Sequence, residues 1–183
     1  MDAGRELIAG CLKHDPIAEK KLYDLFSDEM YGVCLRFAGN ERDAKDMLQI
    51  GFIRVFHYLH QYRFDGQLGG WIKRIILNTA VTYCKRNARY LREVELKETT
   101  IDATFSEDRL SILTVTNLLD IIQELPVGYR TVFNLYVIEE YSHKEIGAML
   151  GITESTAKSQ YHHAKVSIRS RLKALGIDQN SFY

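Results

Sequence analysis

The spacing of apolar residues constrains the fold of this chain more than any other feature of its sequence. From about residue 3 to residue 89, apolar residues recur at steps of three and four, as they do along one side of an α-helix. In the segment EKKLYDLFSDEMYGVCLRFAG, the residues at these steps are Leu22, Leu25, Phe26, Met30, Val33 and Phe37. The whole chain of 183 residues contains only two prolines, so little interrupts such helices. We therefore expect an all-α fold.

Glycine-containing breaks divide the first half of the chain into three long helices. Gly39 and Asn40 form a helix stop, after which a second helix is expected over residues 41–62. Residues 63–70, RFDGQLGG, contain three glycines and predict a loop. A third helix is expected to begin near Trp71.

The distribution of charge predicts a linker in the middle of the chain. Residues 54–92 contain eight basic residues and one acidic residue, whereas residues 93–108 contain six acidic residues and one lysine. The acidic stretch also lacks a sustained apolar face, as is typical of a flexible segment. We predict two small helical domains, residues 1–91 and 113–183, joined by an acidic flexible linker over residues 92–112.

The composition excludes several classes of protein. A formal net charge of zero argues against a uniformly basic nucleic-acid coat. The sequence has no apolar run of about 18 residues and no pattern of a secretion signal, so we expect no membrane insertion. Cys11, Cys34 and Cys84 have unpatterned spacings, which is typical of reduced thiols in a cytosolic protein. We expect a cytoplasmic protein.

The C-terminal segment carries the pattern of a helix-turn-helix. Ser142 and Glu145 have the spacing of a capping box, which predicts a helix beginning at Ser142. Gly151 allows a turn after this helix, and Thr153 is a suitable N-cap for the next one. A short helix, a glycine turn and a longer helix form the motif.

The last helix has one packing side and one side suited to DNA. On a helical wheel, the packing side consists of Ala157, Tyr161, Ala164, Ile168 and Leu172. The other side carries small or hydrogen-bonding residues in the first turns, where a recognition helix meets base edges: Ser155, Lys158, Ser159, His162 and His163. Basic residues farther along suit phosphate contacts, namely Lys165, Arg169 and Lys173. The segment from Ser155 to Ile177 has no acidic residue, which favours DNA binding over a merely solvated basic face.

The second helix is expected to bury one side and to present a mixed stripe on the other. The core side consists of Ala44, Leu48, Phe52, Val55 and Leu59. The opposite side combines charged, amide and isoleucine side chains: Arg42, Asp46, Gln49, Ile50, Ile53 and His57. Such a stripe is suited to docking on a partner helix. Burial against the first helix is the alternative.

The third helix and the glycine loop are candidates for contact with single-stranded nucleic acid. The helix packs through Ile72, Ile75, Ile76, Thr79 and Tyr83. A second side carries aromatic, amide and basic groups along one line: Trp71, Arg74, Asn78, Thr82, Lys85 and Arg89. These groups can neutralise a backbone and stack on an unstacked base, and the loop carries Arg63, Phe64 and Asp65 to close around it. Burial of Trp71 in the core is the alternative.

The sequence contains no pattern of a catalytic or metal site. It has no compact set of carboxylates, no glycine motif that cradles phosphate and no Cys/His cluster. His57 and His60 have helical spacing but no third ligand, and the adjacent His162 and His163 diverge on a helix. We therefore expect no enzyme activity, no metal and no cofactor.

Two segments of the sequence resemble one known family. The stretch DAKDMLQIGFIRVF, followed by a loop, a tryptophan and a basic helix, resembles region 2 of the extracytoplasmic-function (ECF) sigma factors of bacterial RNA polymerase. The stretch LPVGYRTVFNLYVIEEYSHKEIGAMLGITESTAKSQYHHAK resembles their region 4. The resemblance covers most of residues 20–90 and 115–173, in the order of the family and with its linker between them.

The resemblance implies an alternative sigma factor. Such a protein binds the clamp helices of the largest subunit of core RNA polymerase, and it directs promoter recognition, promoter opening and transcription initiation. It contacts promoter DNA both as duplex and as melted single strand, and an anti-sigma factor covers it when idle. We expect a monomer in the free state. The alternative is a stand-alone helix-turn-helix transcriptional regulator, which needs neither the mixed stripe nor the row at Trp71.

The resemblance also implies roles for individual residues. The docking segment corresponds to Asp43, Asp46 and Gln49. The part that engages the melted minus-10 element corresponds to Trp71, Lys73, Arg74 and Asn78, with residues 63–68 near the flipped base. The helix that reads the minus-35 element corresponds to Thr156, Lys158, Ser159, Gln160, His162 and His163.

Two departures from the family pattern bear on specificity. An acidic residue commonly follows the region 2 glutamine, where Ile50 stands here, so contacts with polymerase or an inhibitor differ. Arginines are often found where Gln160 and His163 stand in the reading helix. Because Gln reads adenine and Arg favours guanine, we expect a promoter element unlike that of arginine-rich members.

Overall fold

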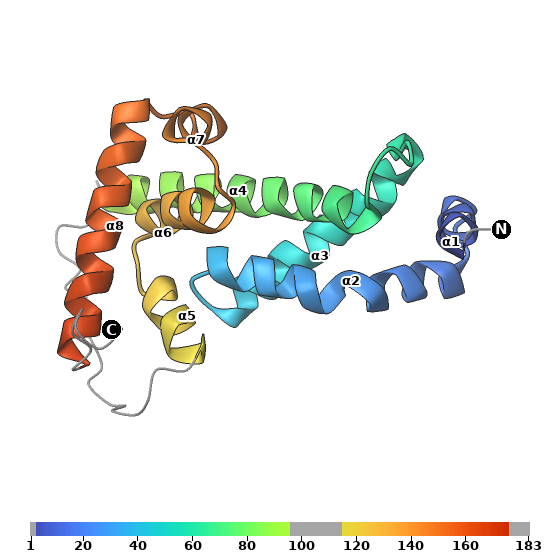
Figure 1. The fold of residues 1–183 in the computed structure, drawn as a ribbon, viewed down its shortest axis with the longest axis horizontal. Helices are drawn as coiled ribbons and strands as arrows, with labels where there is room; N and C mark the ends of the chain where they lie inside the picture. The colour runs from blue at the N-terminus through green and yellow to red at the C-terminus, as the bar shows by residue number, and fades with distance from the viewer. Residues whose placement is uncertain (1–2, 96–114, 176–183) are drawn as a thin grey trace. The chain divides into compact units, whose positions relative to one another are not determined.

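The computed structural model describes residues 3–95 and 115–175, and the regular secondary structure of this part of the chain is all helical (Figure 1). The expected all-α fold is thereby confirmed. The chain divides into two compact units, Met1–Tyr83 and Cys84–Tyr183. This division lies inside one long helix, and the boundaries expected at residues 91 and 113 stay a prediction.

The first unit consists of four α-helices and one short 3-10 turn. These elements are α1 (Ala3–Leu12), α2 (Pro16–Phe37), α3 (Glu41–Tyr58), η1 (Leu59–Gln61) and the first part of α4 (Leu68–Glu95). Asp15 caps α2 by accepting a hydrogen bond from the Ile17 amide at 3.0 Å, and Pro16 occupies its first turn. Asn40 caps α3 by accepting from the Asp43 amide at 2.9 Å. These caps explain why both helices begin where they do.

The core of the first unit follows the predicted helix sides except at Leu25 of α2, which is 60% exposed. All five residues of the expected core side of the second helix are buried, from Ala44 in α3 to Leu59 at the start of η1. They pack with α2, whose buried residues include Leu22, Met30 and Phe37. The three cysteines are buried free thiols.

Three helix ends differ from the sequence-based prediction. The second helix was expected over 41–62, but α3 ends at Tyr58 and η1 follows it. The third helix begins at Leu68 instead of Trp71, and the Trp71 amide already donates to the Gln67 carbonyl oxygen at 3.2 Å. Gly69, one of the glycines that predicted a loop, packs against Phe26, where a Cβ atom would lie 3.1 Å from the ring. At its other end α4 continues to Glu95, into the predicted linker, and residues 96–112 lie outside the described part of the chain.

The second unit is built around the last helix. Its helices are α5 (Val115–Gln123), α6 (Val127–Phe133), the π-helical turn η2 (Asn134–Ile138), α7 (His143–Leu150) and α8 (Glu154–Ala174). Ile121 and Leu125 pack against Ala164 and Ile168 of α8. The buried Arg130 side chain donates to the carbonyl oxygens of Gln123 at 2.7 Å and Leu125 at 2.9 Å, which satisfies the end of α5.

Candidate nucleic-acid interface

The helix-turn-helix predicted from the sequence is formed by α7 and α8. The Ser142 side chain accepts from the Glu145 amide at 3.3 Å, and the Glu145 carboxylate accepts from the Ser142 amide at 2.8 Å. Gly151 ends α7 with a φ of 70°, in the left-handed region that favours glycine. Thr153 caps α8 by accepting from the Thr156 amide at 3.0 Å. The capping box, the turn and the second cap are all confirmed.

The turn brings the two helices into close backbone contact at Gly147. A Cβ atom at this position would lie 2.8 Å from the Ile152 carbonyl oxygen. Only glycine fits at this position without a backbone shift. The atom that a Cβ would meet belongs to the main chain, which cannot move aside as a flexible side chain could. This contact sets the angle at which α8 leaves the turn.

The first turns of α8 present a continuous polar face to solvent. Ala157, Ala164 and Ile168 are buried, as predicted for the packing side. The opposite side is exposed and consists of Ser155, Thr156, Lys158, Ser159, His162 and His163. Glu154, in the first turn, pairs with Lys158 at 2.7 Å. The structure thus brings six of the predicted duplex-binding residues together on one surface.

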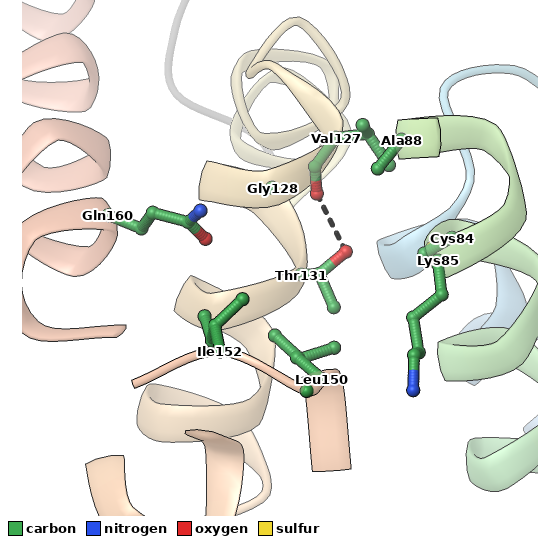
Figure 2. Close-up of a pocket in the computed structure, with 10 residues that line it drawn as sticks. Cys84, Lys85, Ala88, Val127, Gly128, Thr131, Leu150, Ile152 and Gln160 are labelled. Carbon is green, nitrogen blue, oxygen red and sulfur yellow. Dashed lines mark hydrogen bonds between the residues drawn. The ribbon is translucent and has the colours of Figure 1, made fainter. Parts of the chain in front are cut away.

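Gln160 does not lie with the other predicted reading residues. Figure 2 shows its side chain pointing from α8 towards Gly128 of α6. A Cβ atom on Gly128 would lie 3.3 Å from Gln160 Oε1, so the glycine leaves room for the amide group. Gln160 Oε1 is buried and has no hydrogen-bond partner among the described residues. In this conformation the Gln160 amide fills space inside the second unit and does not lie on the exposed polar face of α8.

Aromatic stacking supports the recognition helix, and the sequence patterns did not reveal it. The His143 ring stacks on Tyr136 with centroids 4.2 Å apart, and Tyr161 of α8 lies 4.5 Å from Tyr136. Burial lowers the pKa of His143, and the nearby Lys158 adds to this effect. Lys165, expected at a phosphate, places its Nζ 4.6 Å from the centre of the Tyr161 ring. In the sequence, the aromatic residues on both sides of α7 were the pattern that could have indicated this stacking.

The glycine loop of the first unit holds an aromatic cluster. The Tyr62 ring lies 5.0 Å from Phe64 and 5.5 Å from Trp71. Tyr62 Oη donates to the Gly66 carbonyl oxygen, which closes the loop. Phe64 is 45% exposed and has a φ of 57°, unusual for a residue other than glycine. The half-buried Trp71 thus joins the loop cluster and is not enclosed in the core.

The predicted line of aromatic, amide and basic side chains along α4 is only partly continuous with this aromatic cluster. Arg63, Arg74 and Asn78 are exposed in the first unit, and Lys73 is half-buried. Lys85 is also exposed, but it lies beyond the boundary of that unit. Arg89 lies where side chains are not described. The loop, Trp71, Arg74 and Asn78 are therefore the part of the predicted single-strand surface that one unit brings together.

The mixed stripe on α3 lies on the surface, as its sequence predicted. Ile53 is 63% exposed and Ile50 is 39% exposed, with Gln49 exposed and Asp46 half-buried beside them. Burial of the stripe against α2 is thus excluded. Asp43 differs, since its carboxylate accepts a 2.9 Å hydrogen bond from Tyr83 Oη and joins α3 to α4.

No described helix has the length and apolar character needed to cross a membrane. Within residues 3–95 and 115–175, no group of three or more His, Cys, Asp or Glu side chains has a geometry suited to a metal ion. The His60 ring instead bonds to the His57 carbonyl oxygen at 2.9 Å.

Replacing Ser142 by Ala should make the stability of the helix-turn-helix depend less on pH in the acidic range. Hydrogen bonds from the Ser142 side chain and amide lower the pKa of Glu145 below its ordinary value of 4.5. Their stabilising effect is therefore present above that pH and is lost as the pH falls through the folded-state pKa. The variant should melt a few degrees lower than wild type at pH 7, and this difference should shrink towards pH 3. Melting curves followed by circular dichroism test this, with exposed Ser170→Ala as control; a pH-independent difference would contradict it.

Comparison with known proteins gives matches along both units. The family model described as Sigma-70 region 2 matches residues 22–90, and the one described as Sigma-70, region 4 matches residues 116–168. The ECF RNA polymerase sigma factor SigW of Bacillus subtilis is 29% identical over 174 residues, which are 89% of this chain and 93% of that protein. The ECF sigma factor SigE of Mycolicibacterium smegmatis is 30% identical over 154 residues, which are 80% of this chain and 58% of the relative.

A solved structure has the same fold at low sequence identity. It is the sigma factor RpoE in complex with the anti-sigma factor NepR from Bartonella quintana, with a TM-score of 0.51 and 15% identity. The match covers 84% of this chain and 96% of that one.

Proposed function

Because this chain belongs to the ECF sigma factors of bacterial RNA polymerase, we propose that it divides promoter recognition between its two helical units. An alternative sigma factor binds core RNA polymerase and directs transcription initiation as a DNA-recognition subunit. Its work with polymerase and promoter DNA takes place in the cytoplasm.

The second unit reads the duplex minus-35 element through the exposed face of α8. Ser155, Thr156, Ser159, His162 and His163 offer hydrogen-bonding groups at base edges, and Lys158 adds a positive charge. Arg169 and Lys173, which are exposed farther along, suit phosphate contacts. Gln160 would have to leave its place against Gly128 to reach a base, so it contributes less than sequence position implies.

The first unit holds the melted minus-10 strand. Phe64 offers an exposed ring for stacking on an unstacked base, with Trp71 behind Tyr62 in the same cluster. Arg63, Arg74 and Asn78 lie exposed nearby, and Lys73 adds a half-buried basic group. Lys85, predicted for the same surface, lies beyond this unit, where its Nζ donates to the Met149 carbonyl oxygen at 3.1 Å. Capture of a flipped base offsets part of the free energy of opening, which costs a few kcal/mol per step. No hydrolysis is required.

The stripe on α3 docks on the clamp helices of the largest polymerase subunit. Ile50 and Ile53 supply apolar contact area, while Asp46 and Gln49 supply polar contacts around it. Asp43 acts by holding α3 to Tyr83. Docking tethers both DNA-binding units to one polymerase, so the first promoter contact raises the effective concentration for the second.

An anti-sigma factor would cover these surfaces in the idle protein. The solved sigma factor with the same fold is bound to such a partner. The exposed isoleucines of α3 and the exposed Phe64 are apolar groups that a cover would protect from water. A monomer is expected in the free state.

The exposed isoleucine stripe of α3 is the observation that favours a sigma factor over a stand-alone regulator. A helix-turn-helix repressor has no use for it, and Ile53 is 63% exposed on the surface. Run-off transcription with bacterial core polymerase on a promoter library tests the choice. Transcripts that need the protein and share two upstream elements support a sigma factor. Duplex binding without transcription would favour the regulator.

Replacing Ser159 and His162 separately by Ala should weaken binding to the upstream promoter element by about tenfold each. A direct base contact contributes roughly 1–3 kcal/mol of discrimination, and each change removes one hydrogen-bonding group from the exposed face of α8. Affinity for a duplex carrying the selected minus-35 element is measured by gel shift of the holoenzyme. Ser170→Ala, an exposed serine farther along α8, is the matched control. Equal affinity for all three variants would contradict the reading face.

A further inference from the structure

Helix α1 places a positive charge on the aromatic loop. The Arg5 guanidinium carbon lies 5.3 Å from the centroid of the Phe64 ring. A guanidinium within about 6 Å of a ring centroid is attracted by the negative face of the ring. Arg5 and Phe64 are far apart in sequence, so the contact depends on the direction of α1.

The base of α1 is fixed firmly against α2. Ile8 and Cys11 are each 3% exposed. At the corner between the helices, a Cβ atom on Gly10 would lie 2.6 Å from the Ala18 Cβ, so the two backbones approach more closely than any side chain would permit. The Gly10 carbonyl also accepts from the amides of Lys13 at 3.0 Å and Asp15 at 3.1 Å. Arg5 therefore projects from a firmly packed helix, about one turn before the buried Ile8.

Phe64 needs support from its surroundings. Its φ of 57° lies in the left-handed region, which is unfavourable for a residue with a Cβ atom. Such a conformation persists when neighbouring contacts hold it. Tyr62 contacts the Phe64 ring at 5.0 Å, and Arg5 supplies the contact from outside the loop.

We propose that Arg5 is a positioning residue for base capture: from α1 it holds Phe64 in the orientation in which the ring receives an unstacked promoter base. This inference rests on the proposed role of the loop in holding the melted minus-10 strand. Trp71, Tyr62, Phe64 and Arg5 follow one another in contact, with each neighbouring pair of rings tilted by 55°. Arg5 lies at the outer end, and Phe64 remains 45% exposed, which leaves part of its ring accessible to a base. Arg5 acts through Phe64 and not as an independent phosphate contact.

The free protein allows a first test that needs neither polymerase nor DNA. Trp71 is the single tryptophan of the chain, and its ring lies 5.5 Å from Tyr62, so its fluorescence reports on this series of contacts. Arg5→Ala should raise the acrylamide quenching constant of Trp71, while Arg5→Lys should raise it less. Lys13→Ala, which removes an exposed positive charge just after α1, should leave it unchanged. Equal quenching of wild type and Arg5→Ala would overturn the proposal.

A double-mutant cycle with holoenzyme tests the consequence for DNA. Arg5→Ala should lower affinity for a fork-junction DNA, made from a promoter selected by run-off transcription, by about three- to tenfold, as expected for one cation–π contact. In a Phe64→Ala background the same change should have no further effect. A loss of equal size in both backgrounds would overturn the positioning role, because Arg5 would then contact DNA directly. If wild-type holoenzyme opens no promoter, the proposed function fails, while the quenching result still decides whether Arg5 positions Phe64.

Discussion

Ile53→Asp should release the protein from core RNA polymerase and lower run-off transcription by about thirtyfold or more. Ile53 is 63% exposed and is the more exposed of the two isoleucines in the stripe, which also includes Ile50, Gln49 and Asp46. A carboxylate placed in such an interface must lose its hydration without gaining a partner. Central anchors of protein interfaces contribute about 2 kcal/mol or more, which corresponds to roughly thirtyfold in affinity.

Ile17→Asp is the matched control for this experiment. It makes the same chemical change at a residue of α2 that is even more exposed, 79%, and that lies outside the stripe. Both variants should fold normally, because neither side chain belongs to the core. Core binding is measured by fluorescence anisotropy of labelled protein, and transcription by run-off assay. Similar losses for both variants would remove the stripe from the polymerase interface; a joint Asp46→Ala and Gln49→Ala variant should reproduce the loss of Ile53→Asp.

Gly147→Ala should disrupt the helix-turn-helix and abolish duplex binding. The added Cβ would lie 2.8 Å from the Ile152 carbonyl oxygen and 3.4 Å from the Glu154 amide nitrogen. These are backbone atoms of the turn, so the clash is relieved only by moving α8 relative to α7. Overpacking of this kind costs roughly 1–3 kcal/mol, a large share of the stability of a small unit.

Thermal unfolding and a gel shift with promoter duplex measure the two consequences of Gly147→Ala. Gly32→Ala is the matched control, since it lies within α2 and its Cβ would meet no atom within 4 Å. That change should leave stability equal or raise it by about 0.5–1 kcal/mol, because alanine favours a helix more than glycine does. Normal melting and normal duplex binding of Gly147→Ala would contradict the role assigned to the close contact.

The elements predicted correctly from the sequence depend on neighbouring residues. The capping box at Ser142 and Glu145 and the turn at Gly151 involve partners a few residues apart, so their hydrogen bonds follow from local order. The packing side of α8 and the exposed stripe of α3 follow from helical periodicity. These features sufficed to predict the fold class, the helix-turn-helix and the exposure of the α3 stripe.

Other features depend on which helices meet. Gln160 was predicted to read DNA, but the space left by Gly128 accepts its side chain. Gly69 of α4 packs against Phe26 of α2, and no local pattern indicates this contact. The same holds for the stacking of His143 on Tyr136 and for the position of Arg5 over the Phe64 ring.

The sequence by itself therefore determined the helices, their caps and the two sides of each helix, because these arise from short-range hydrogen bonding and from the partition of apolar side chains. The tertiary structure decided which polar side chains on those helices remain available for binding. That choice depends on space and contacts supplied by residues distant in the chain: Gly128 for Gln160 and Phe64 for Arg5.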